Sequence, residues 1–259
     1  MIKSTFRFFD VAANLTDPTF EGIYHGKRKH PADRQQVIDR AQAVGCDKFL
    51  VAAGNLPNFV SAKAMYQPGM YFTIEAEIKS CPAKQLVAIG ECGLDYDRLE
   101  HSSKEQQLAV FPLHFALAER YKLPLYLHNR NTGKDFFELM EAHRSSYSGG
   151  VLHSFTGTAE ELKRALELGL YIGLNGCSLK TKENLEVVRE VPLERLVLET
   201  DCPYCEIRKS HAGFEFVENR PDMKNPEKST GETPVRGRNE PARIVEVLEA
   251  VSRVKAVER

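Results

Sequence analysis

Short apolar runs rich in β-branched residues alternate with amphipathic segments along almost the whole chain. Eight runs have the length and composition of β-strands, at residues 6–12, 48–53, 70–76, 86–90, 124–128, 150–153, 170–174 and 195–199. Between most of them, apolar residues recur at three- and four-residue intervals, which predicts helices at residues 34–44, 104–121, 133–142, 159–168 and 182–190.

Strands that are apolar on both faces and separated by helices are typical of a parallel sheet covered by helices. Eight of them favour closure into a TIM-like (β/α)8 barrel, with a doubly wound open sheet as the alternative α/β fold. Barrels of this kind fill about 250 residues with one core, so we predict that residues 1–259 form a single domain.

Two parts of the predicted barrel are irregular. Residues 77–84, with Pro82, leave too little room for a covering helix, which predicts a shortened third βα unit. Residues 208–239 are polar, rich in proline and poor in periodicity, which predicts a long loop that covers the site or holds substrate.

Composition excludes several classes of protein. The 35 basic and 36 acidic residues give a formal charge of −1, so any binding to nucleic acid must be local, for example through Lys27 to Lys29 or through Arg236 and Arg238. The N-terminus does not resemble a signal peptide, and no run approaches the roughly 18 apolar residues of a membrane span. Six scattered cysteines predict reduced thiols, and we interpret the C-x-x-C spacing of Cys202 and Cys205 as incidental.

Metal-binding residue types follow four of the predicted strands. These residues are Glu91, His128, His153 and Asp201. Each alone is more simply explained as a capping or structural residue, but the carboxyl ends of parallel strands in a barrel all open on one face, where four such side chains can meet. The pattern therefore predicts a metal site at the barrel mouth.

Two imidazoles and two carboxylates suit Zn or Mn, and carboxylate-rich sites also accept Mg. One or two divalent ions are expected, since a bound ion lowers the pKa of water toward roughly 7 and a second can stabilise the leaving oxygen. We assign catalysis to Asp201 and Glu91, with Asp201 accepting the proton of the attacking water. Arg130 suits a phosphate oxygen because its planar fork donates two parallel hydrogen bonds.

Seven stretches in order along the chain carry a family resemblance. They are residues 14–17 (NLTD), 88–95 (AIGECGLD), 127–130 (LHNR), 151–158 (VLHSFTGT), 171–176 (YIGLNG), 199–203 (ETDCP) and 238–241 (RNEP). In these stretches the sequence resembles the TatD family of metal-dependent deoxyribonucleases, and within it the eukaryotic TatD DNase domain-containing branch.

The resemblance implies a TIM-barrel hydrolase of DNA phosphodiesters, acting as a 3′–5′ exonuclease or an endonuclease, with links to DNA repair or DNA fragmentation. It also implies metal ligands at Glu91, His128, His153 and Asp201. Because the chain stops at Arg259, before the terminal helix with which relatives normally close the barrel, the resemblance further implies a truncated C-terminal helix. Asn14 and Thr16 stand where many relatives carry an H-x-H pair, and we predict that Asn14 and Arg130 contact the substrate.

Two other functions remain open. A barrel with such a site also suits hydrolysis of small amides or esters, and a catalytically impaired relative would bind nucleic acid without cutting it. DNA affinity that falls steeply with salt would favour the nuclease over the small-molecule hydrolase. We expect the protein to bind a DNA substrate and not a membrane. We also expect it to be a monomer and to be located in the nucleus or the cytoplasm.

Overall fold

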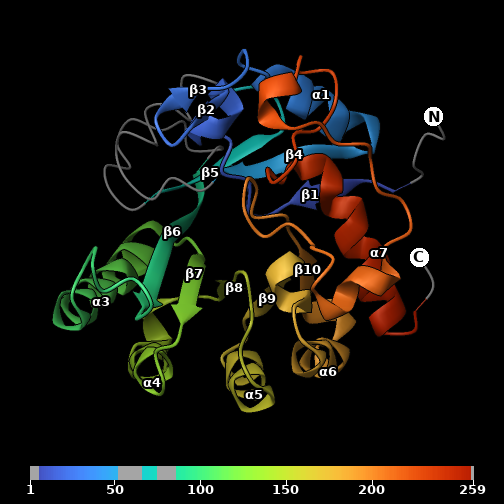
Figure 1. The fold of residues 1–259 in the computed structure, drawn as a ribbon. Helices are drawn as coiled ribbons and strands as arrows, with labels where there is room; N and C mark the ends of the chain where they lie inside the picture. Colours follow the sequence, from blue (N-terminus) through green and yellow to red (C-terminus); the bar gives the residue numbers. More distant parts are fainter. Residues whose placement is uncertain (1–5, 52–65, 75–85, 258–259) are drawn as a thin grey trace.

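The computed structural model describes residues 6–51, 66–74 and 86–257. Within them, one eight-stranded parallel sheet is surrounded by helices (Figure 1). Its strands pair in chain order and are β1 (Phe8–Asp10), β4 (Cys46–Val51), β5 (Met70–Ile74), β6 (Leu86–Asp95), β7 (Leu125–Arg130), β8 (Gly150–Leu152), β9 (Tyr171–Leu174) and β10 (Leu196–Leu198). A separate antiparallel hairpin joins β2 (Ile23–Tyr24) to β3 (Lys27–Arg28).

The chain brings the first and last strands of the sheet together just beyond their ends. Ala13 and Cys202 form a parallel bridge, in which the Asp201 amide donates to the Ala12 carbonyl at 2.9 Å. Below it, the carboxylate of Asp10 accepts from the Thr200 amide at 2.9 Å. The eight strands therefore form a nearly closed barrel, and the prediction of a TIM-like barrel is confirmed.

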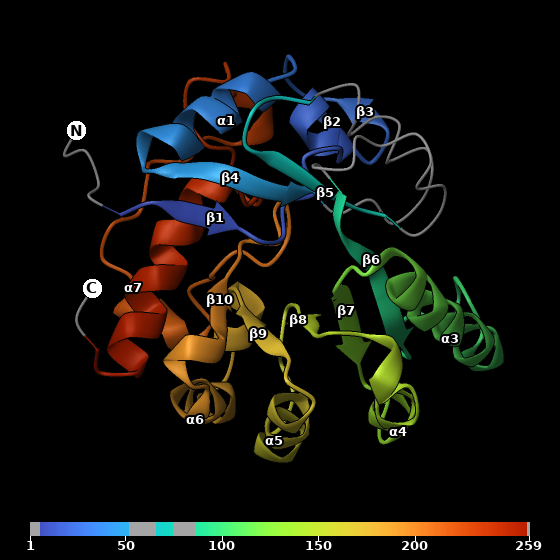
Figure 2. The same cartoon turned by 180° about the vertical axis from the view of Figure 1, so that it is seen from behind.

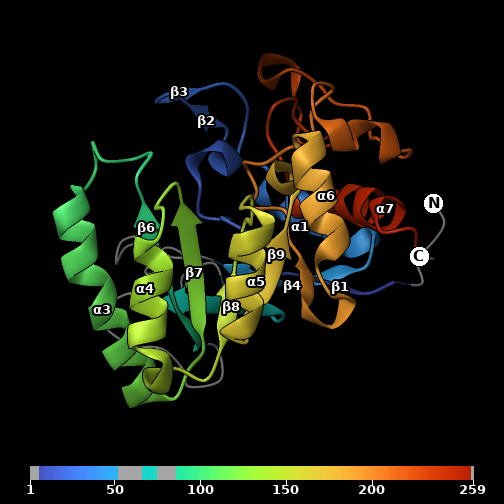
Figure 3. The ribbon, with the colours of Figure 1, turned by 90° about the horizontal axis from the view of Figure 1, so that it is seen from below.

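Helices form an outer layer around these strands (Figures 1 and 2). They are α1 (Arg34–Ala43), α3 (Lys104–Tyr121), α4 (Asp135–Ala142), α5 (Ala159–Glu167), α6 (Lys182–Glu190) and α7 (Ile244–Val254). Seen from below, α3 to α6 follow one another along the outside of β6 to β9 (Figure 3). Side chains satisfy the first amides of three of these helices through capping boxes that begin at Ser103, Thr158 and Thr181.

The five predicted helices are confirmed to within two residues at each end. The sequence pattern did not single out α7, which packs on β10 and α6 and covers the last part of the barrel. The predicted short third unit lies at residues 75–85, outside the described part of the chain. No described helix combines the length and the hydropathy needed to cross a bilayer.

Residues 208–239 are irregular as predicted, with only the short 3-10 turns Ala212–Phe216 and Pro226–Lys228. None of them lines the pocket that holds the candidate ligands, so the prediction that they cover the site is wrong, while a role in holding substrate stays a prediction. Arg238 instead anchors the segment to the N-terminal part of the chain through Asp33, with N–O distances of 2.6 and 2.7 Å. Arg238 is 1% exposed, so its predicted contribution to a DNA-binding surface is also wrong.

Candidate metal centre

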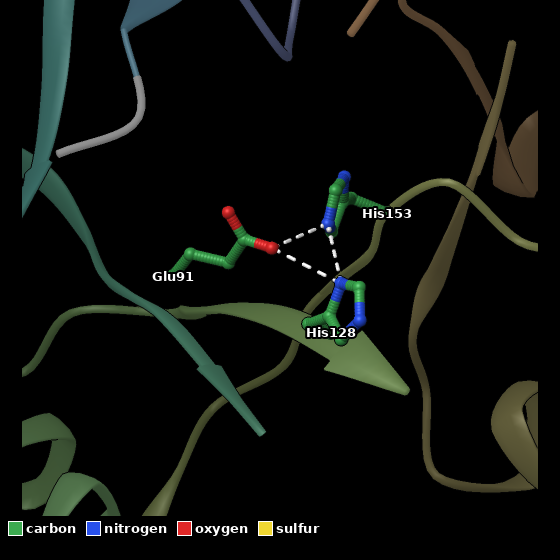
Figure 4. A group of neighbouring side chains, drawn as sticks. All are labelled: Glu91, His128 and His153. Atoms are coloured by element: carbon green, nitrogen blue, oxygen red, sulfur yellow. Dashed lines mark hydrogen bonds and ion pairs between the residues drawn. The ribbon is translucent and has the colours of Figure 1, made fainter. Parts of the chain in front are cut away.

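Three of the four predicted ligands converge on one point at the barrel mouth (Figure 4). The Glu91 carboxylate oxygen Oε1 lies 2.8 Å from Nε2 of His153 and 3.1 Å from Nδ1 of His128. The two ring nitrogens are 3.1 Å apart. Of the residues that the structure describes, these are the only three whose metal-binding atoms all lie within 4.8 Å of one another.

A β-bulge places Glu91 in the mouth. Strand β6 was predicted to end at Gly90 but continues to Asp95, and three residue steps from Ile89 to Cys92 face two steps on β7. A bulge of this kind redirects a side chain, here that of Glu91. Gly93 lets the two strands approach, because a Cβ at this position would lie 1.9 Å from the carbonyl oxygen of His128.

The two histidines come from neighbouring strands. His128 lies within β7, not at its end as predicted, while His153 directly follows β8. The Nε2 atom of His128 lies 3.2 Å from Oδ2 of Asp95, which fixes the orientation of its ring. Metal-binding histidines commonly have such a carboxylate partner on the nitrogen that faces away from the ion. The ring of His153 stacks on Tyr126, with 4.9 Å between ring centroids.

Glu199 is a buried carboxylate next to the candidate ligands that the sequence pattern did not single out. It is 0% exposed, and its Oε1 atom accepts from the Ser154 amide at 2.6 Å and from Nδ2 of Asn175 at 3.0 Å. The same oxygen lies 3.7 Å from Nδ1 of His153. The sequence signal that could have identified Glu199 is its position as a charged residue at the end of the apolar run 196–199. A carboxylate at such a buried position usually has a partner.

Asp201 lines the same pocket but stands apart from the group of three. Its backbone is left-handed, with φ of 52°, a conformation that aspartate adopts more readily than most residues. Nδ2 of Asn14 donates to Oδ1 of Asp201 at 2.9 Å, and Sγ of Cys205 donates to Oδ2 at 3.2 Å. Asn14, predicted to contact substrate, therefore orients a candidate ligand.

The site favours positive charge. Burial acts to lower the pKa of His153, but the carboxylates of Glu91 and Glu199 outweigh it and raise this pKa well above its usual value. Burial is likewise outweighed at Glu91, whose pKa is lowered well below its usual range by His153 and His128. Burial raises the pKa of Asp201 to about 6, with the charge of His153 opposing the shift.

A pocket of about 480 Å³ opens above these residues. Besides the four candidate ligands, basic and polar side chains line it, among them Asn14, Arg98, Arg130, Lys180 and Tyr204. Arg130 is half exposed, and its Nε atom lies 2.9 Å from Oδ2 of Asp97. The predicted phosphate-contacting arginine thus lies at the pocket, paired with an acidic neighbour.

The donor set fits a divalent ion. Two imidazole nitrogens and a carboxylate oxygen point to one centre, a combination that suits Zn, Mn and other first-row divalent metals. The buried imidazole of His153 has a carboxylate, Glu199, behind it, as metal-bound histidines usually do. The protein therefore contains a group of residues that can hold a metal.

Comparison with known proteins gives one consistent result. A family model described as TatD related DNase matches residues 9–259. The protein named deoxyribonuclease Tat-D of Schizosaccharomyces pombe is 40% identical, over 97% of this chain and 90% of its own. The protein named 3′-5′ ssDNA/RNA exonuclease TatD of a Rahnella strain is 32% identical, over 94% and 89%. The crystal structure of a TatD family hydrolase from Entamoeba histolytica superposes with a TM-score of 0.89 at 33% identity, covering 99% of this chain and 94% of that one.

Proposed function

Because the chain belongs to the TatD related DNase family, we propose that it is a metal-dependent deoxyribonuclease whose metal is held by Glu91, His128, His153 and Asp201. The observation that carries this proposal is the convergence of Glu91, His128 and His153 within 4.8 Å at the mouth of a barrel. Enzymes with this barrel carry their active sites at that face.

A bound divalent ion would supply a nucleophile at neutral pH and neutralise charge on the phosphate. The protein's own residues do the positioning. Asp95 orients His128, Glu199 backs His153, and Asn14 holds the carboxylate of Asp201. Reactive groups held in fixed geometry lose little entropy on the way to the transition state.

Asp201 is the proposed general base. Burial raises the pKa of this carboxylate in the metal-free protein, which makes it a better acceptor for the proton of the attacking water. Glu91 has a pKa held far below this by His153 and His128, which suits a permanent ligand and not a proton acceptor. The proposed division of labour follows from these opposite shifts.

The proposed substrate is a DNA strand whose phosphate enters the pocket beside Arg130. Arginine pairs with phosphate oxygens in two parallel hydrogen bonds, and Lys180 and Arg98 add positive charge to the same pocket. Because one relative is named a 3′-5′ ssDNA/RNA exonuclease, we propose that this protein also cuts from a 3′ end. We further propose one barrel domain over residues 1–259, a monomer, and a nuclear or cytoplasmic location.

The direct test is hydrolysis of a labelled DNA strand with Mg or Mn by the wild type, Glu91→Ala and Asp201→Asn, each confirmed as folded by circular dichroism. We expect both substitutions to reduce cleavage at least about a hundredfold, since each removes a metal ligand. No cleavage by a folded wild type would favour the impaired, binding-only relative. Cleavage that both variants retain would mean that the site lies elsewhere.

A further inference from the structure

Two cysteines far apart in the sequence meet on the wall of the metal pocket. The Sγ atoms of Cys177 and Cys205 lie 2.8 Å apart, and both residues line the pocket. The C-x-x-C spacing of Cys202 and Cys205 was interpreted as incidental, and Cys202 is 0% exposed and takes no part in this contact. The relevant partner comes from the turn that follows β9.

The backbone holds the two thiols in place. Gly176 packs so closely on the segment of Cys205 that a Cβ there would lie 2.1 Å from the Cys205 carbonyl oxygen. The Cys177 amide donates to Oδ1 of Asn175 at 2.8 Å, and the Nδ2 atom of this asparagine is bound to Glu199. Neither thiol can move far from the other without disturbing the network behind His153.

The chemical setting differs from that of the other described cysteines. Cys46, Cys92 and Cys202 are buried, and burial raises the pKa of the Cys46 and Cys202 thiols. The pKa of Cys177 is instead lowered to about 7, chiefly by its contact with Cys205 and also by the positive charge of Lys180, against the effect of burial. A partly exposed thiol with a second thiol in contact is the arrangement of a reactive pair.

We propose that Cys177 and Cys205 form an oxidation site, at which hydrogen peroxide converts the two thiols into a disulfide on the wall of the metal pocket. The sulfur of Cys177 attacks one peroxide oxygen and breaks the O–O bond, which gives a sulfenic acid and one water. The sulfur of Cys205 then attacks the sulfur of Cys177, the S–O bond breaks, and the leaving hydroxide takes the thiol proton as a second water. Each sulfur gives up one electron and the peroxide takes up both.

The disulfide would change the site through Asp201. In the reduced protein, Sγ of Cys205 donates to Oδ2 of Asp201 at 3.2 Å. Oxidation removes this proton and draws the sulfur toward Cys177, so Asp201 loses one of its two side-chain donors and keeps Asn14. The effect on cleavage rests on the proposed function, whereas formation of the disulfide does not.

The test treats the reduced full chain with hydrogen peroxide, alkylates the remaining thiols under denaturing conditions and identifies the peptides by mass spectrometry. We expect a peptide pair joined through Cys177 and Cys205, loss of two of the six thiols, and reversal by dithiothreitol. Cys46→Ser is the matched control and should retain the cross-link. In Cys205→Ser, dimedone should label Cys177. Peroxide that leaves both thiols alkylatable, or that joins a different pair, overturns the proposal.

Cleavage of labelled DNA, measured on the same samples, tests the link to Asp201. We expect oxidation to slow the wild type at least about tenfold, reversibly, as loss of a contact to a ligand does. Cys177→Ser, compared with its own untreated sample, should not respond. A cross-linked protein that cleaves at the unoxidised rate overturns the link, while a reduced wild type that never cleaves, yet cross-links, overturns only the proposed nuclease function.

Discussion

The buried carboxylate of Glu199 links the metal centre to the strands beneath it. Its Oε1 atom contacts Ser154, Asn175 and His153, and Oε2 has space only because residue 173 is a glycine. A Cβ at residue 173 would lie 2.6 Å from Oε2 of Glu199. A negative charge behind an imidazole fixes its tautomer and makes its outer nitrogen a better ligand. Glu199 is therefore a positioning residue for His153.

Replacing Glu199 by glutamine tests this role, because the amide keeps the size and an acceptor for Ser154 while it removes the charge. We expect the affinity for Mn or Zn to fall about 10- to 100-fold, measured by isothermal titration of the chelated, metal-free protein. The melting temperature serves as the control for folding. An unchanged affinity in a folded protein would show that Glu199 serves packing alone.

At the scale of elements, the site depends on how closely β6 approaches β7. Gly93 has φ of 146° and would collide with the His128 carbonyl if it carried a side chain, whereas Gly26, at φ of 74° on the β2–β3 turn, has open space around it. The positive φ disfavours residues with a side chain at both positions, but only at Gly93 would a side chain also push two strands apart. The difference between the stability lost on substitution at Gly93 and at Gly26 therefore measures the contribution of close packing between β6 and β7.

We expect Gly26→Ala to lower the free energy of unfolding by about 1 kcal/mol, the cost of a left-handed residue with a side chain. Gly93→Ala should cost roughly 3 kcal/mol or more, because β6 and β7 must also move apart, and it should weaken metal binding through His128. Urea denaturation and metal titration of the two variants measure this. Equal losses of stability would mean that the strands can adjust freely.

The contact between β1 and the segment after β10 contains a second buried carboxylate, that of Asp10. It accepts from the amides of Ala12 and Thr200 and from the Thr200 hydroxyl. Burial raises the pKa of Asp10 from 3.8 to about 7, against the effect of these hydrogen bonds. A folded pKa above the unfolded one means that the folded protein binds the proton more tightly, so stability is lost as pH rises from about 4 to about 7.

Asp10→Asn should remove this pH dependence, since the amide stays neutral and can still accept the two backbone hydrogen bonds. We expect the stability of the variant, relative to the wild type, to rise by up to about 4 kcal/mol between about pH 4 and pH 8, at 1.36 kcal/mol for each pKa unit. Urea denaturation across this pH range measures the difference in the free energy of unfolding between the variant and the wild type. The contributions of other titrating groups are the same in both proteins and cancel in this difference. A constant difference would contradict a raised pKa.

The periodicity of apolar residues was sufficient to predict the strand number, the barrel and four residues at its mouth, because each depends on local pattern and on the common direction of parallel strands. It could not predict that β6 passes through Glu91, since a bulge depends on the register with β7. Nor could spacing pair Cys177 with Cys205, or bury Arg238 against Asp33, because both contacts join distant parts of the chain.

For the molecule as a whole, the formal charge of −1 means that DNA must be attracted by local groups and not by a general positive field. Strand β7 offers a comparison of two cations at its opposite ends. Arg130 ends the strand at the pocket, while Lys122 precedes its first residue, Leu125. Strand β7 itself extends over six residues, which at about 3.3 Å each is roughly 20 Å, so its two ends lie about twice the screening length in 0.1 M salt apart.

We expect the affinity of Asp201→Asn for a labelled single strand to fall with salt, with a log–log slope of about −0.7 for each phosphate contacted. Adding Arg130→Gln should make this slope shallower by about 0.7, because one contact to phosphate is lost at the pocket. Adding Lys122→Gln instead removes the same charge from the other end of β7 and should leave the slope unchanged. Fluorescence anisotropy over a range of salt concentrations measures all three proteins. Equal effects of the two substitutions would show that DNA responds to total charge and does not enter the pocket beside Arg130.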